Sequence, residues 1–195
     1  MSPRPTPASR GIVRQLLADE VTDRVKELLS SYLDRNGEWL YFGALNSGTL
    51  YRIRTVDIER FLKWPLELAA RIEKYAEITL SDGITSDLRG NIYLTDIEHS
   101  ALVRVSPTRD LETLIKDKRI RWPDGFSFGP DGWLYVTGSA LNDVLGRPKW
   151  CIKAHGPYPI YRFRPGEEGI PGHLFCALYG LLSPRREVSR GTCLA

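Results

Sequence analysis

Two aspartates occupy equivalent places in a repeated sequence, and their chemistry makes them candidates for a binding site. Asp82 and Asp124 each precede a glycine and lie 42 residues apart. Ca²⁺ takes six to eight oxygen ligands, often from several carboxylates or amides. The pair therefore predicts a metal or polar-ligand site. In the alternative, each carboxylate accepts backbone hydrogen bonds at the start of its own strand.

A second candidate lies in Ala154-His-Gly-Pro-Tyr158, where His155 and Tyr158 could line a ligand tunnel or anchor a loop. Asp96 ends a predicted strand and is expected to form a turn. No catalytic residue is predicted, because the chain has neither a Gly-x-Ser-x-Gly nucleophile elbow nor a His-Glu-x-x-His metal motif. The three cysteines include no Cys-x-x-Cys spacing, so neither a zinc site nor a dithiol redox pair is suggested.

The elements that must position these residues follow from the repeat. Five positions recur at an offset of 42: Asp82, Gly83, Gly90, Tyr93 and Thr95 in the first copy, and Asp124, Gly125, Gly132, Tyr135 and Thr137 in the second. A period of about 40–50 residues that holds four short strands is typical of a propeller blade. Residues 36–41 echo the middle of the unit as a weaker third copy, in which Leu29-Ser-Ser-Tyr-Leu33 stands in place of the leading Asp-Gly.

The hydrophobic pattern predicts a helix over residues 12–29, a hairpin over 38–55, and a helical stretch over 57–74 interrupted at Pro65. Further strands are predicted at about 76–80, 83–87, 91–95, 100–105, 111–116, 125–128, 133–137 and 159–164. The predicted fold is mainly β: a partial β-propeller of two to three four-stranded blades with an N-terminal helix. We expect a disordered N-terminus at 1–10, a helical segment at 11–30, the propeller at 31–172 and a tail without strand pattern at 173–195.

Four stretches resemble the yellow/major royal jelly protein family of the bacterial type. They are Asn36–Gly43 with Thr49–Arg54, Ser81–Ile84 through Asn91–His99, Arg121–Gly125 through Gly132–Val136, and Ala154–Tyr158 with Tyr161–Arg164. The resemblance covers roughly residues 34 to 172 and implies a six-bladed β-propeller. More distantly, the chain is similar to the gluconolactonase/regucalcin propellers, which are calcium-dependent lactone hydrolases.

The repeat and the absence of a catalytic constellation favour a protein of this type that binds a small ligand, with Asp82, Asp124, His155 and Tyr158 as ligand-binding residues. The alternative is a Ca²⁺-dependent lactone hydrolase in which Asp82 and Asp124 hold the metal; the acid that relatives supply from an early blade has no match here. A six-bladed ring at this period needs roughly 250 residues or more, so we expect a truncated or rearranged product, with or without a function of its own. Its exposed blade faces and strand edges predict self-association.

Composition limits the remaining classes. The chain has 195 residues, 42% hydrophobic and 26% charged, as in ordinary globular proteins. Its net charge is only +3 and its basic residues alternate with acids, so nucleic acid is not an expected partner. The sequence shows no signal peptide and no apolar run long enough to cross a membrane, and it predicts no compartment.

Overall fold

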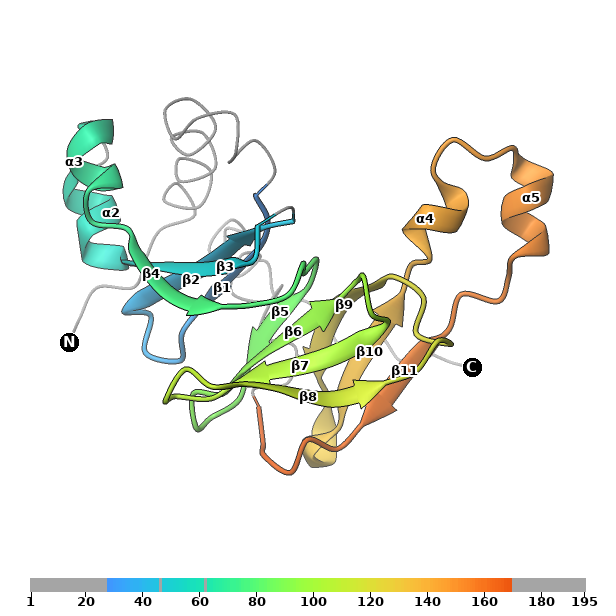
Figure 1. Ribbon diagram of the computed structural model, residues 1–195. Helices are drawn as coiled ribbons and strands as arrows, with labels where there is room; N and C mark the ends of the chain where they lie inside the picture. Colours follow the sequence, from blue (N-terminus) through green and yellow to red (C-terminus); the bar gives the residue numbers. More distant parts are fainter. Residues whose placement is uncertain (1–27, 46, 62, 170–195) are drawn as a thin grey trace, which may run out of the picture.

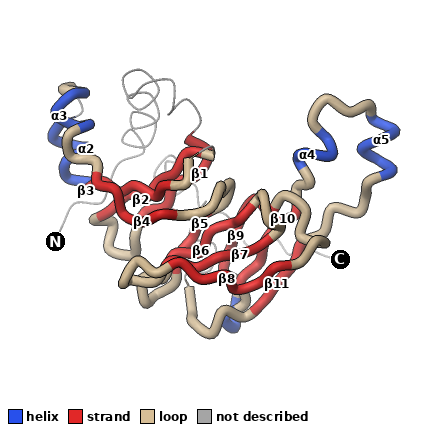
Figure 2. The backbone as a smooth tube through the Cα atoms, in the orientation of Figure 1, coloured by secondary structure: helices blue, strands red, loops and turns tan. Residues whose placement is uncertain are grey.

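The computed structural model describes residues 28–45, 47–61 and 63–169, and these form three antiparallel sheets with a few short helices (Figures 1 and 2). Each sheet is a meander whose strands follow one another in the chain. Blade 1 comprises β1 (Leu28–Leu33), β2 (Trp39–Ala44), β3 (Thr49–Arg54) and β4 (Glu73–Glu77). Blade 2 comprises β5 (Ile84–Ser86), β6 (Ile92–Asp96), β7 (Ala101–Val105) and β8 (Leu111–Lys116). Blade 3 comprises β9 (Pro123–Phe128), β10 (Leu134–Gly138) and β11 (Ile160–Phe163).

This arrangement confirms the prediction of a mainly β, partial propeller. The leading strands β1, β5 and β9 contact one another in that order. We call these three strands the hub, and the three blades that radiate from them the fan. The tight turns expected at the two repeated glycines are also present. Gly90 and Gly132 have φ values of 85° and 69°, which glycine adopts without the strain of a side chain. The offset of 42 residues therefore corresponds to one blade.

Two predicted boundaries differ from the structure. Residues 28–30 belong to strand β1 rather than to the end of a helix, because Leu28 and Ser30 pair with Ala44 and Gly43 of β2. Tertiary pairing here overrides a helical pattern. The strand expected at 76–80 lies earlier, as β4, where its Glu77 pairs with Thr49 of β3. The expectations for residues 1–27 and 170–195 lie outside the described residues.

The core lies between the blades. Blades 1 and 2 enclose one cluster that includes Leu50, Leu94 and Val103. Blades 2 and 3 enclose another, in which Tyr93 and Leu134 are fully buried. Because a single sheet cannot bury both its faces alone, this stacking supplies the apolar burial that holds the fan together.

The outer face of blade 1 is covered by two helices from its own chain. Helices α2 (Thr55–Phe61) and α3 (Pro65–Ala69) connect β3 to β4, and Ile58 and Leu68 pack on Leu40 and Ile53 of the sheet. The expectation that the partial propeller exposes its blade faces is therefore wrong at this end. Among the described residues, no helix is long and apolar enough to cross a membrane.

Candidate functional site at the hub

The structure brings Asp82 and Asp124 together at the hub, where β5 and β9 begin. Gly83 shows how close the two segments approach. A Cβ at Gly83 would overlap the carbonyl oxygen of Asp124 and would lie 3.2 Å from Cγ2 of Thr95. Both aspartates remain partly exposed. The repeat thus places two carboxylates from neighbouring blades on one face of the fan.

The repeated threonines hold these segments in place. The Thr95 hydroxyl oxygen accepts hydrogen bonds from the backbone N–H groups of Asp82 and Gly83, at 3.0 and 2.9 Å. In the next blade, the Thr137 hydroxyl accepts from the N–H of Gly125 at 2.9 Å. Threonine therefore accepts from both N–H groups of the first Asp-Gly pair and from that of Gly125 in the second. Within the described residues, neither the Asp82 nor the Asp124 carboxylate accepts a hydrogen bond from a backbone N–H. The alternative, in which each carboxylate accepts backbone hydrogen bonds at the start of its own strand, is therefore not observed.

The two carboxylates have different surroundings. The indole N–H of Trp122 donates to Oδ2 of Asp82 at 2.9 Å, a hydrogen bond that crosses from blade 3 to blade 2. Burial, and then the nearby charge of Asp82, raise the pKa of Asp124 above its usual range. A cationic ligand at this pair would relieve the repulsion between the two acids.

Sequence reasoning missed Trp122 and Arg121 as members of this site. An Arg-Trp-Pro-Asp-Gly run was visible, but nothing in it indicated a partner 40 residues upstream. Trp122 adopts a left-handed conformation with φ 43°, which is costly for a residue with a bulky side chain. Its carbonyl oxygen accepts a hydrogen bond from the N–H of Ser139, the first residue of the excursion at residues 139–159 that joins β10 to β11. Strained backbone of this kind is held in place by its surroundings.

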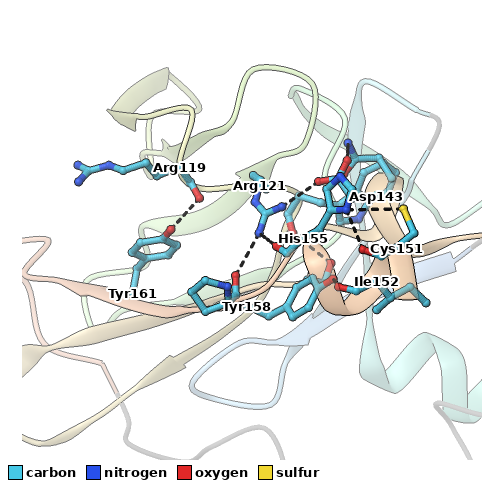
Figure 3. A network of polar contacts seen from close by, with 12 residues as sticks. Arg119, Arg121, Asp143, Cys151, Ile152, His155, Tyr158 and Tyr161 are labelled. Atoms are coloured by element: carbon cyan, nitrogen blue, oxygen red, sulfur yellow. Dashed lines mark hydrogen bonds and ion pairs between the residues drawn. The ribbon is translucent and has the colours of Figure 1, made fainter. Parts of the chain in front are cut away.

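Arg121, which precedes β9, holds that excursion against blade 3 through an ion pair and hydrogen bonds (Figure 3). Its guanidinium pairs with Asp143 at 3.0 Å and donates to the carbonyl oxygens of His155 and Pro157 at 2.8 and 3.1 Å. The excursion carries helices α4 (Leu141–Val144) and α5 (Lys149–Ala154). The excursion begins directly after Gly138 of β10. Gly138 pairs with Pro123 of β9, the residue before Asp124.

His155 and Tyr158 lie within this excursion and are exposed. Nδ1 of His155 lies 2.8 Å from the carbonyl oxygen of Cys151, and the Tyr158 hydroxyl donates to that of Ile152 at 2.6 Å. Their observed contacts therefore anchor the loop. No hydrogen bond between described residues joins either side chain to Asp82 or Asp124.

Asp96 forms a turn, as expected, and orients a histidine. Its Oδ1 accepts the backbone N–H of His99 at 3.0 Å, and Nδ1 of the same histidine lies 3.0 Å from both carboxylate oxygens. Asp96 is buried, whereas the His99 side chain is 54% exposed. Blade 3 does not repeat this pair, because the position that matches Asp96 is Gly138.

Ala140 also has a left-handed backbone, with φ 46°, where it follows β10. We expect Ala140→Gly to leave stability unchanged or raise it by up to about 1 kcal/mol, because glycine removes the steric cost but adds freedom to the unfolded chain. Ala154→Gly, within helix α5, is expected to lower stability by about 0.5–1 kcal/mol. Urea unfolding of both variants measures this; an equal loss in both would contradict the strain at Ala140.

The donor set at the hub fits Ca²⁺ only in part. Asp82 and Asp124 offer at most four carboxylate oxygens, and one of these already accepts from Trp122, whereas Ca²⁺ takes six to eight. Within the part of the chain that the structure describes, no group of three or more His, Cys, Asp or Glu side chains could hold a metal ion.

The fold defined by these sheets is that of β-propeller proteins. The chain is similar to a gluconolactonase from Xanthomonas campestris, at 13% identity and a TM-score of 0.52, over 88% of this chain and 55% of that one. It is also similar to a luciferin-regenerating enzyme, at 15% identity and a TM-score of 0.52, over 75% of this chain and 48% of that one.

Virginiamycin B lyase from Staphylococcus aureus matches at 13% identity and a TM-score of 0.46, over 78% of this chain and 45% of the lyase. The chain thus spans about half the length of the solved structures it matches. No family model matches the sequence, and no curated protein matches it. At these identities the likeness shows the fold alone.

Proposed function

We propose that this chain binds a small, positively charged molecule at the hub face, as a protein of the yellow/major royal jelly type. The observation that carries the proposal is the meeting of Asp82 and Asp124, from consecutive blades, at the partly exposed starts of β5 and β9. Two neighbouring carboxylates, one with a raised pKa, favour a ligand that supplies positive charge.

Titration calorimetry tests this proposal with four probes: tyramine as an aromatic amine, calcium chloride, glucose and gluconolactone. We expect heat from the amine and a loss of affinity of about tenfold or more in Asp82→Asn and in Asp124→Asn, since each variant removes one charge from the pair. Asp131→Asn is the matched control. It removes a charge from the same blade, in the turn between β9 and β10, and is expected to bind as the parent does.

Absence of heat with every probe would remove the binding proposal. Equal loss of affinity in all three variants would show that net charge matters and the hub pair does not.

The calcium-dependent lactone hydrolase is a second candidate, motivated by the same two carboxylates. The limited donor set at the pair places it behind the binding protein. It requires gluconolactone turnover that depends on added Ca²⁺ and falls in Asp82→Asn and Asp124→Asn. If turnover is absent in excess Ca²⁺, this candidate fails while the proposal of amine binding stands.

A further inference from the structure

The repeated Asp-Gly pairs of blades 2 and 3 follow two equivalent residues, Leu80 and Trp122, which form the same backbone hydrogen bond. In blade 2 the carbonyl oxygen of Leu80 accepts the N–H of Ile97 at 3.1 Å. In blade 3 the carbonyl oxygen of Trp122 accepts the N–H of Ser139, also at 3.1 Å. The two acceptors are 42 residues apart and so are the two donors. This bond is therefore part of the repeated blade.

The two equivalent residues differ in their backbone conformation. Trp122 is left-handed, with φ 43°, whereas Leu80 is not among the described non-glycine residues with a positive φ. The left-handed region costs a residue with a side chain roughly 1–2 kcal/mol. Because Leu80 forms the same backbone bond without that conformation, the blade itself does not require the strain. A contact found only at Trp122 must hold it there.

The contact that distinguishes Trp122 is its hydrogen bond to the hub pair. The indole N–H donates to Oδ2 of Asp82 at 2.9 Å, across from blade 3 to blade 2, and a leucine has no donor for such a bond. The backbone of Trp122 is held as well, because its carbonyl oxygen accepts both the N–H and the hydroxyl of Ser139, each at 3.1 Å. Trp122 thus ties Asp82 to the segment that carries Asp124, two residues further along.

A neutral donor on one carboxylate oxygen affects metal ions and organic cations differently. The indole N–H occupies an acceptor position at the pair and supplies no oxygen ligand, whereas Ca²⁺ requires six to eight oxygens. A protonated amine needs only one or two directional acceptors, and a carboxylate that is already fixed in place loses less freedom when it accepts them.

We propose that Trp122 positions Asp82 and makes the hub pair select an organic cation that donates hydrogen bonds over a metal ion. The selection rests on the proposed function and assigns it a residue. The positioning stands on the indole contact and on the difference between Trp122 and Leu80.

NMR of the indole N–H groups tests the positioning without any ligand. In the parent, the Trp122 indole proton should resonate downfield of a free indole, because its N–H is bound to a carboxylate. Asp82→Ala should move this signal toward the free position. Asp117→Ala is the control, since Asp117 is also an acid of blade 2 but pairs with Arg119, and it should leave the signal in place. A Trp122 signal that does not move in Asp82→Ala would overturn the positioning.

Titration calorimetry of the full chain with tyramine and with calcium chloride tests the selection. Trp122→Phe keeps most of the ring but cannot donate, so we expect the ratio of Ca²⁺ affinity to tyramine affinity to rise about tenfold. Trp133→Phe is the matched control. It changes another tryptophan of blade 3, whose ring contacts the Arg162 guanidinium at 4.3 Å, and it should keep the parent's ratio.

An unchanged ratio in Trp122→Phe, or an equal change in both variants, would overturn the selection. If the parent binds neither probe, the proposed function fails and the selection fails with it. The NMR comparison still decides the positioning in that case, because Asp82→Ala and Asp117→Ala both keep Trp122.

Discussion

Gly83→Ala is expected to destabilise the chain by roughly 3 kcal/mol, at the upper end of the usual cost of overpacking. The new Cβ would overlap the carbonyl oxygen of Asp124, which is backbone and cannot rotate away as a side chain can. The strands β5 and β9 would have to separate, and the Thr95 hydroxyl that holds Gly83 would be displaced with them. Thermal unfolding measures the loss as a fall in Tm of about 8 °C for a chain of this size.

The repeat offers a matched control in Gly125, the equivalent glycine of blade 3. A Cβ there would lie 3.5 Å from Oγ1 of Thr137, an ordinary contact, and the position is exposed. Gly125→Ala should leave stability within about 1 kcal/mol of the parent, because it also reduces the freedom of the unfolded chain. Similar melting of the two variants would show that β5 and β9 do not approach each other as described.

Asp87→Ala is the second substitution with a large expected effect. Asp87 is buried at the end of blade 2's leading strand and accepts four hydrogen bonds. Its donors are the N–H groups of Arg89 and Asn91, the Asn91 side-chain amide at 2.7 Å, and the Tyr93 hydroxyl at 2.9 Å. Burial, and then the bond to Asp87, raise the pKa of Tyr93.

Alanine would leave several of these buried donors without an acceptor, so we expect a loss of about 3–4 kcal/mol in the free energy of unfolding, measured by urea titration. Asp117→Ala is the control, because Asp117 accepts the N–H of Arg119 in the same kind of two-residue turn but its side chain is 31% exposed. It should melt close to the parent. If both substitutions have the same small effect, the buried network around Asp87 is not formed as described.

Blade 3 has no acid at the position that matches Asp87. The position equivalent to Asp87 is Gly129, and the Tyr135 ring packs directly against it. In blade 2 the matching tyrosine, Tyr93, donates to the carboxylate instead. The same strand geometry is thus supported by a polar network in one blade and by an aromatic ring on glycine in the next.

The sequence predicted most of the strands because the spacing of Asp, Gly, Tyr and Thr reports one hydrogen-bonded unit. Thr95 and Thr137 recur because each binds the backbone of its own Asp-Gly turn. Interactions between units leave no such periodic signal. The contact of Trp122 with Asp82 and the covering of blade 1 by α2 and α3 depend on the tertiary arrangement, so the repeat did not indicate them.

The same distinction applies to the candidate site. Asp82 and Asp124 were found because they repeat and because adjacent blades place repeated residues side by side. His155 and Tyr158 do not repeat, and the structure shows them anchoring the excursion. Their place in ligand binding remains a prediction for the amine experiment.

The acid pair makes the stability of the folded chain depend on pH. A raised pKa of Asp124 means that the folded chain holds this proton more tightly than the unfolded chain does. The contribution of Asp124 to stability therefore falls as the pH rises through its titration, from the unfolded pKa to the folded one. Asp124→Asn should remove that penalty above the folded pKa.

Carboxyl ¹³C NMR titration of Asp124, in chelated buffer, tests most directly whether two blades bring their acids together. We expect a pKa above the usual aspartate range in the parent, and a lower one in Asp82→Asn, where the neighbouring charge is gone. An Asp124 that titrates as a free aspartate, with the same pKa in Asp82→Asn, would contradict the shared hub.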